Sequence, residues 1–140
     1  MRRIPRIKSV MTPFPYSIAP SASLEEALAM MTAHDIRHLP VCENHAVIGV
    51  LAERDARVAL AVWRGDIELT VREVCNEPYL VDLDQPLDEV SAEMAARRIG
   101  YAIVMRGDKL AGILTPTDVC RLLATTLRDA YPEVEDDDVA

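Results

Sequence analysis

The sequence predicts an α/β (α+β) fold made of two copies of one β-α-β-β-α unit. Three observations predict it: an internal repeat, apolar residues at helical spacing in each copy, and short apolar runs beside turn residues. An offset of 63 residues places Leu24 on Leu87 and Asp55 on Asp118, without a gap between them. Because one such unit cannot cover both faces of its sheet, the two copies are expected to pack against each other.

The first copy carries start and stop signals for its helices. Ser23 and Glu26 form a Ser-x-x-Glu capping box, which is typical of a helix N-terminus. Gly65 fits the C′ position after the second helix. The predicted elements are a strand at Tyr16–Ile18, a helix from Leu24 to about Asp35, strands at Leu39–Cys42 and Ala46–Leu51 around a turn, and a helix from about Arg54 to Arg64.

The second copy repeats this order, with a Gly107-Asp108 turn in its hairpin. Its predicted elements are a strand at Leu80–Leu83, a helix at Leu87–Arg98, strands at Tyr101–Met105 and Leu110–Leu114, and a helix from Thr117 to about Ala130. We therefore divide the chain into a first repeat (1–65), a linker (66–72), a second repeat (73–130) and an acidic tail (131–140) that is expected to be disordered.

Composition argues against several classes of function. The chain has 140 residues, a formal net charge of −8 and a pI near 4.8, and an acidic surface repels nucleic acid and anionic lipid. No stretch of sequence approaches the roughly 18 apolar residues of a membrane span. The cysteines Cys42, Cys75 and Cys120 are widely spaced, which is typical of a reducing compartment. We expect a cytoplasmic protein that binds neither nucleic acid nor membrane.

Motifs of catalysis and of metal binding are missing from the sequence. His34 and His38 stand four residues apart, but Pro40 follows closely and the helix should end between them, which argues against zinc. The five glycines form neither a P-loop nor a Gly-x-Gly-x-x-Gly motif, and a Gly-x-Ser-x-Gly elbow does not occur. We therefore expect no enzyme, no required cofactor and no metal.

Four segments, taken together, resemble a known family. They are Val10–Pro13, Ile36–Val41, Gly49–Asp55 and Gly112–Asp118. In this order, and with this duplication, they resemble the CBS domain pair, or Bateman module, over roughly residues 7–127. The resemblance implies two repeats facing each other across a pseudo-two-fold axis, adenosine nucleotides bound in the clefts between them, and a flat dimer of two such pairs. It also implies regulation of a partner rather than catalysis.

Thr115-Pro116-Thr117-Asp118 is the segment on which the main predicted cleft depends. Unpaired N–H groups and the dipole at a helix start suit a phosphate. The Asp118 carboxylate can accept hydrogen bonds from both ribose hydroxyls, while Thr115 and Thr117 supply hydroxyl donors. The same residues also make a good helix start, with Thr115 as N-cap and Asp118 at N3. Both roles can coexist.

Family geometry implies that this cleft also takes residues from the first repeat. An adenine is expected against Tyr16 and Ile36, with Arg37 or His38 nearer the phosphates. The alternatives are ordinary packing for Tyr16 and Ile36, and a plain surface position for His38. The predicted main cleft comprises Asp118, Thr115, Thr117, Ile113, Thr12, Tyr16, Ile36, Arg37 and His38.

The second predicted cleft departs from the family pattern. Ala52 stands where a Thr or Ser hydroxyl is expected, although Asp55 remains and Arg54 can contribute a phosphate contact. We therefore expect weaker binding in this cleft, or none. Gly100 has no side chain where Arg37 stands in the first copy, and Ile103 takes the place of Pro40. The predicted residues of this cleft are Asp55, Arg54, Tyr79, Ile99 and Tyr101, with Gly100 beside them.

Three functions remain open at this level. The first is a regulatory protein that binds AMP, ADP or ATP, forms a homodimer and signals to a protein effector in trans, through a shift between orientations of the repeats. The second is a ligand-free module for assembly, which the altered Ala52 and Gly100 positions favour. The third is an enzyme of a kind that its motifs do not reveal.

Overall fold

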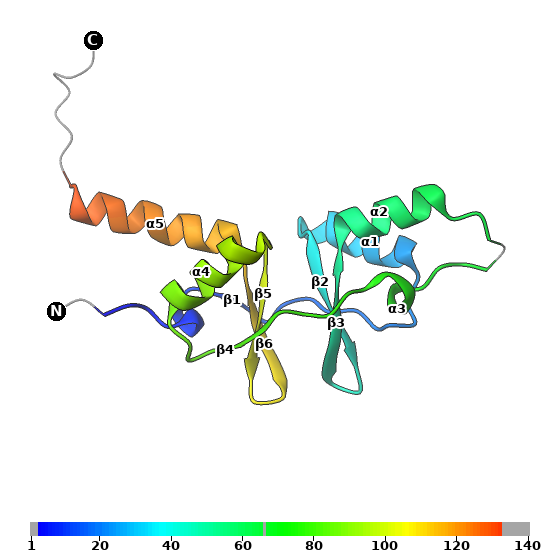
Figure 1. The fold of residues 1–140 in the computed structure, drawn as a ribbon, viewed down its shortest axis with the longest axis horizontal. Coiled ribbons are helices and arrows are strands. Elements are labelled where there is room, and N and C mark those ends of the chain that lie inside the picture. The colour runs from blue at the N-terminus through cyan, green and yellow to red at the C-terminus, as the bar shows by residue number, and fades with distance from the viewer. Residues whose placement is uncertain (1–2, 66, 133–140) are drawn as a thin grey trace, which may run out of the picture.

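The computed structural model describes residues 3–65 and 67–132, and in it the two repeats lie side by side (Figure 1). The first part of the chain contains η1 (Ile7–Ser9), β1 (Thr12–Pro13), α1 (Leu24–His34), β2 (His38–Glu43), β3 (Ala46–Ala52), α2 (Glu53–Val62) and α3 (Val71–Val74). The second part contains β4 (Leu80–Asp82), α4 (Leu87–Arg97), β5 (Ala102–Arg106), β6 (Lys109–Leu114) and α5 (Pro116–Ala130). The predicted fold class is confirmed.

Local signals explain where most helices begin and end. The Ser23 hydroxyl accepts a hydrogen bond from the Glu26 N–H at 3.1 Å, as an N-cap does. Asp35 and Arg98 close α1 and α4 in the left-handed conformation, with φ of 52° and 55°. Gly107 turns the β5–β6 hairpin with φ of 61°. The helices α1, α2, α4 and α5 lie on one side of the two hairpins (Figure 1).

Each repeat receives its edge partner from the lead-in segment of the other. The larger sheet has the order β1-β6-β5-β4, and β1 pairs antiparallel with β6 through Thr12 opposite Ile113. The smaller sheet is the β2–β3 hairpin, and Asn76 forms a single antiparallel bridge to Val50 of β3. The lead-in segment of each repeat thus pairs with the sheet of the other repeat, and these two pairings tie the repeats together.

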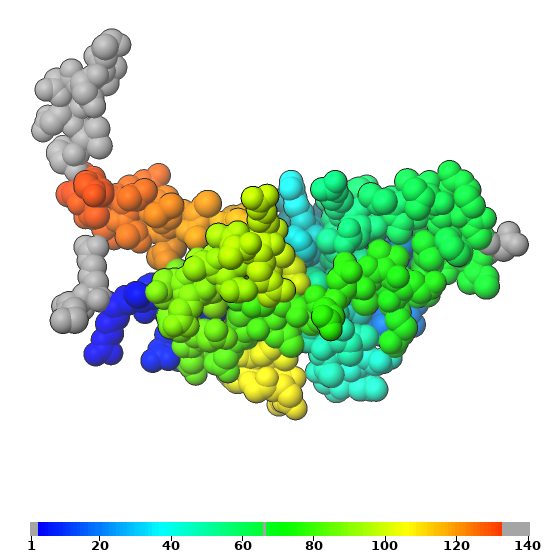
Figure 2. Space-filling view, in the orientation of Figure 1, coloured from blue at the N-terminus to red at the C-terminus, as the bar shows by residue number. Residues whose placement is uncertain are grey.

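Three clusters of buried side chains stabilise this arrangement. One lies within the first repeat around Leu24, Met31 and Leu51, and one within the second around Val90 and Leu114. The third joins the two sheets and consists of Val50, Tyr101, Ile103 and Met105. Figure 2 shows the repeats packed against each other without a break between them, with the end of α5 projecting beyond the body.

The predicted strand at Tyr16–Ile18 was wrong. Only Ile18 pairs, in an isolated parallel bridge to Val41. Pro15 and Pro20 lie on either side of this segment, and a proline has no N–H to extend a ladder. The Tyr16 ring instead stacks on His34, with 3.7 Å between the ring centroids.

The predicted role of Gly65 as a helix C′ residue was also wrong. Helix α2 ends at Val62, and Trp63 follows it in an extended conformation, while Gly65 is not among the residues with positive φ. The Trp63 indole donates a hydrogen bond to the Ile67 carbonyl at 2.8 Å. This folds the ring over Gly65, where a Cβ would overlap it. The glycine therefore permits a close approach rather than a left-handed turn.

The segment predicted as a linker contains structure of its own. Helix α3 begins at a capping box formed by Thr70 and Glu73, and Val71 is fully buried in the core of the first repeat. Residue 66 of the predicted linker and residues 133–140 of the predicted acidic tail lie outside the described residues. Within residues 3–65 and 67–132, no helix is long and apolar enough to cross a membrane.

Candidate functional site

The candidate site begins where β6 turns into α5. Thr115 is the N-cap residue, Pro116 follows at N1, and Thr115 and Asp118 form a reciprocal capping box. The carboxylate of Asp118 accepts hydrogen bonds from the Thr115 N–H at 3.0 Å and from the Thr115 hydroxyl at 3.2 Å. The capping role that the spacing predicted is therefore confirmed for this helix.

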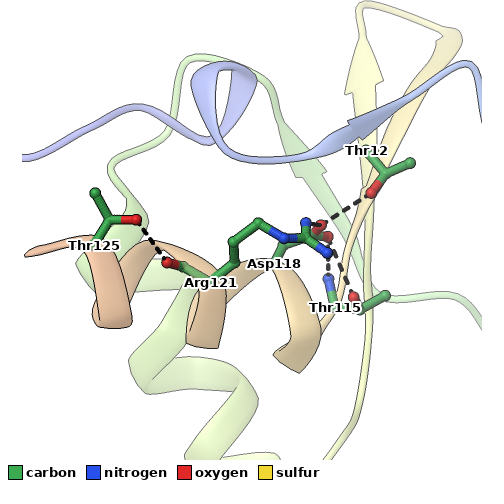
Figure 3. A network of polar contacts seen from close by, with 5 residues as sticks. All are labelled: Thr12, Thr115, Asp118, Arg121 and Thr125. Carbon is green, nitrogen blue, oxygen red and sulfur yellow. Dashed lines mark hydrogen bonds and ion pairs between the residues drawn. The ribbon is translucent and has the colours of Figure 1, made fainter.

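Asp118 also links this helix to the start of the chain. Its Oδ1 accepts a hydrogen bond from the Thr12 hydroxyl at 3.0 Å and lies 3.6 Å from a guanidinium nitrogen of Arg121 (Figure 3). The residue is only 5% exposed, so these groups take the place of water around its charge. A ribose diol can reach both carboxylate oxygens only if some of these partners move. The ribose contact expected of Asp118 therefore stays a prediction, and it requires one or more of these partners to move.

A cleft of about 710 Å³ opens beside this helix start, between the two repeats. All nine residues of the predicted main cleft line it: Thr12, Tyr16, Ile36, Arg37, His38, Ile113, Thr115, Thr117 and Asp118. Six further residues complete the lining: Pro15, Asp35, Pro40, Gly100, Pro116 and Arg121. The structure therefore brings these nine positions together in one cleft, and their role in binding stays a prediction.

The walls of the cleft differ in chemistry. Tyr16, whose ring His34 supports from one face, is half-exposed and forms an apolar surface with Ile36, Ile113 and Pro40. The exposed side chains of Arg37 and Arg121 approach the cleft from opposite repeats. Arg121 was missed from the sequence, although its position three residues after Asp118 on a helix places it on the same face.

His38 lies on the inner wall of the cleft, where β2 begins. Its ring packs against that of Tyr101, with the centroids 4.9 Å apart and the planes inclined at 33°. Burial lowers the pKa of His38 from its usual value, Asp55 opposes this by raising it, and Arg37 lowers it further. A plain surface position for His38, one of the alternatives, is therefore excluded.

The second predicted cleft is organised differently. Asp55 is exposed and accepts a hydrogen bond from the Asn76 amide at 3.0 Å, which mirrors the tie between Thr12 and Asp118. Tyr101 is only 7% exposed, because its ring belongs to the central cluster and its hydroxyl accepts a hydrogen bond from the Tyr79 N–H at 3.0 Å. Tyr101 thus fills space at the position that corresponds to His38.

The remaining residues predicted for this cleft also lie apart. The Tyr79 ring is covered by the guanidinium of Arg97, 4.5 Å from its centroid, and Arg54 is exposed at the start of α2. Ile99 lines an apolar groove of about 330 Å³ between α4 and α5. Gly100 lines the main cleft instead, where a Cβ on it would lie 3.4 Å from the His38 Cε1. Neither the main cleft nor this groove includes Asp55, Arg54, Tyr79 or Tyr101.

Within the described part of the chain, no three His, Cys, Asp or Glu side chains gather closely enough to hold a metal ion. Cys42, Cys75 and Cys120 are free thiols, and burial raises the pKa of Cys42 while a hydrogen bond with Ser17 opposes that rise. The cleft between the repeats is therefore the candidate site.

Solved structures share this architecture. A Vibrio cholerae protein assigned to acetoin utilization is 25% identical, with a TM-score of 0.82 over 95% of this chain and all of the other. A CBS domain pair in complex with 5′-methylthioadenosine and S-adenosyl-L-methionine is 27% identical, with a TM-score of 0.73 over 85% of this chain and 99% of the other. The CBS domain of a bacterial CNNM/CorC family Mg²⁺ transporter in complex with ATP is 25% identical, with a TM-score of 0.72 over 85% of this chain and 87% of the other.

Curated relatives place the same module in larger proteins. A zinc metalloprotease of Methanocaldococcus jannaschii is 30% identical over 119 residues, which are 85% of this chain but only 32% of the relative. The chain therefore spans about a third of that protein's length. The family model of the CBS domain matches residues 7–62 and again residues 71–125. The chain belongs to the CBS domain family and carries two CBS domains, arranged as a pair.

Proposed function

We propose that this CBS pair is a regulatory module that binds an adenine nucleotide, AMP, ADP or ATP, in the main cleft and is not itself an enzyme. The observation that carries the proposal is the cleft, to which both repeats contribute apolar walls and cationic side chains. Its volume of about 710 Å³ falls within the range of small-molecule sites. The solved relatives that hold ATP, 5′-methylthioadenosine or S-adenosyl-L-methionine support an adenosine-containing ligand.

The charges around the cleft favour a phosphorylated ligand over a cationic one. In a chain with a net charge of −8, Arg37 and Arg121 line this cleft together with the carboxylates of Asp35 and Asp118, and that of Asp118 is already engaged by Thr12, Thr115 and Arg121. The first turn of α5 adds the positive end of its dipole, and the Thr117 side chain is exposed there. Guanidinium groups bind phosphate oxygens well and repel a sulfonium. We therefore assign the apolar wall at Tyr16 and Ile36 to the adenine. The phosphates are assigned to the part of the cleft that Arg37, Arg121 and the start of α5 border.

Isothermal titration calorimetry with AMP, ADP, ATP and adenosine tests this assignment. R37Q and R121Q are expected to weaken ATP binding more than adenosine binding, because only the phosphates meet the guanidinium groups. R128Q is the matched control, since Arg128 lies on α5 but not in the cleft. Equal loss for ATP and adenosine, or no binding of any of the four compounds, would contradict the proposal.

Asp118 is a poor first substitution for this test. Its removal would leave the Thr12 hydroxyl and the Thr115 N–H without their partner, so a loss of binding could reflect a loss of folding. Thr117→Ala is a better choice, with Thr126→Ala as its control, because both threonines are exposed on α5. A saturating ligand at 100 times its Kd stabilises the fold by about 2.7 kcal/mol, which a thermal-shift assay detects.

The position of Tyr101 predicts how many nucleotides bind to each chain. Because this buried ring fills the second cleft near its centre, we propose one nucleotide per chain. The calorimetric titration that measures the affinity also measures this number. Two equivalent sites per chain would show that the second cleft opens in solution.

We also propose that the chain pairs with a second copy and acts on a protein effector in trans. The apolar groove between α4 and α5 supports the pairing, since Met94, Val119 and Cys120 line it together with Ile99. Cys120→Glu places a charge in this groove, and light scattering coupled to size exclusion is expected to show a loss of dimer. If the wild type is a monomer at all concentrations, the pairing is refuted. If nucleotides do not bind but the dimer persists, the ligand-free assembly module becomes the better function.

A further inference from the structure

His38 stands at the junction between the main cleft and the centre of the molecule. Its side chain lines the cleft, and its ring packs on Tyr101 of the central cluster. Gly100 of the opposite repeat lies near this ring, since a Cβ added to it would come to 3.4 Å from the His38 Cε1. A change in charge on His38 would therefore be felt on both sides of the interface between repeats.

The charged groups that face His38 come from several elements. Asp55 of α2 raises its pKa and the neighbouring Arg37 lowers it, but burial is the largest influence and lowers it below the usual 6.5. Tyr101 of β5 contributes an uncharged ring. Asp35, Asp118 and Arg121 line the same cleft, and the carboxylate of Asp118 is already occupied by Thr12 and Thr115. The imidazole is thus mainly neutral at pH 7 while the cleft is empty.

We propose that His38 takes up a proton from solvent when a nucleotide's phosphates enter the main cleft, so that nucleotide affinity rises as the pH falls. This inference rests on the proposed function. A phosphate brings negative charge into a partly buried site, where Coulomb interactions are stronger than in water. Protonation then gives His38 a second N–H donor toward that charge. The proton ends on the imidazole, and no covalent bond other than this N–H changes.

The proposal applies to this cleft and not to its pseudo-equivalent. The offset of 63 residues places His38 on Tyr101, and a tyrosine has no basic nitrogen that could take up a proton. His34 and His45 are both exposed and do not line the cleft. His38 is therefore the histidine of this cleft, and comparison with H38Q separates its proton from protons taken up by other groups.

The test is calorimetry with ATP from pH 5.5 to 8.5, in pairs of non-phosphate buffers that differ in ionisation enthalpy. ATP has its own titrating phosphate, so the quantity compared is the affinity of the wild type relative to H38Q. This ratio is expected to rise as the pH falls, by up to about tenfold for each pKa unit that the ligand adds to His38. Proton uptake should likewise be larger in the wild type than in H38Q, while the control H45Q behaves as the wild type.

Each outcome decides something. If ATP binds H38Q and the wild type with the same dependence on pH, the inference is overturned and the proposed function stands. If ATP binds neither protein at any pH in the range, both are overturned. If H38Q does not fold, NMR titration of the histidine Cε1–H signals in the wild type replaces it. H34Q and H45Q assign the signals of the three histidines. The pKa of His38 is then expected to rise on addition of ATP, and an unchanged His38 signal would overturn the inference.

Discussion

Replacing Thr12 with valine tests how the two repeats are tied together. The side chains have nearly the same shape, so T12V removes chiefly the hydrogen bond from the Thr12 hydroxyl to the Asp118 carboxylate, which is 3.0 Å long. A hydrogen bond to a charged group contributes about 1.5–3 kcal/mol. Asp118 is 5% exposed, so water cannot easily replace the lost donor. The strand β1 has only two residues.

The pseudo-equivalent tie supplies a matched control. The Asn76 amide donates to Asp55 at 3.0 Å, but both residues are exposed, so N76A should cost less than about 1 kcal/mol, as exposed interactions do. At roughly 3–4 °C per kcal/mol for a chain of this size, T12V is expected to lower the Tm by about 5–12 °C. Scanning calorimetry of both variants measures this. A T12V loss no larger than that of N76A would refute the reasoning that burial of Asp118 makes the tie strong.

Three further predictions concern stability and are checked by thermal or urea unfolding. Because the pKa of His38 is lowered in the folded state, the unfolded chain binds the proton more readily. The wild type should therefore lose stability as the pH falls below about 6.5. H38Q should lose less stability over this pH range, and H45Q should lose as much as the wild type. G112A should cost about 1–3 kcal/mol, because the new Cβ would lie 2.8 Å from the Thr12 carbonyl oxygen and push β1 off β6; an unchanged midpoint would contradict this. G107A should lower the free energy of unfolding by about 1–2 kcal/mol through the left-handed backbone alone, since its Cβ would meet open space. G107N should cost less, because asparagine tolerates this conformation better. Equal losses of stability in the two variants would argue against backbone strain as the cause.

Much of the fold was predictable because the signals are local and occur twice. The capping residues Ser23 and Thr115 begin α1 and α5 as predicted, and Gly107 turns the hairpin. The residues of the cleft were predicted from the family resemblance, which implies that the lead-in and β2 of one repeat face the junction of β6 and α5 of the other. Local periodicity and capping need only neighbouring residues, so they can be read from the chain itself.

What could not be predicted depends on distant contacts. The pairing of β1 with β6 joins residues about 100 positions apart in two-residue strands, which are too short to show any alternation. Helix α3 is also too short for periodicity, although the Thr70-x-x-Glu73 spacing was a readable capping signal. Gly65 was misassigned because both a helix end and a close aromatic contact favour glycine, and only the position of the Trp63 ring distinguishes them.

The two clefts show where duplication preserves structure and where it permits difference. Thr12 with Asp118 and Asn76 with Asp55 form the same tie by different donors, so the exchange of lead-in segments holds in both halves. The centre differs, because His38 leaves one cleft lined with polar groups while Tyr101 is buried and fills the other. The ties join the repeats in both halves, and our proposal is that the ring at the centre decides which cleft accepts a nucleotide. Together with the differences at Ala52 and Gly100, this difference between His38 and Tyr101 makes the two clefts unlike each other within a duplicated fold.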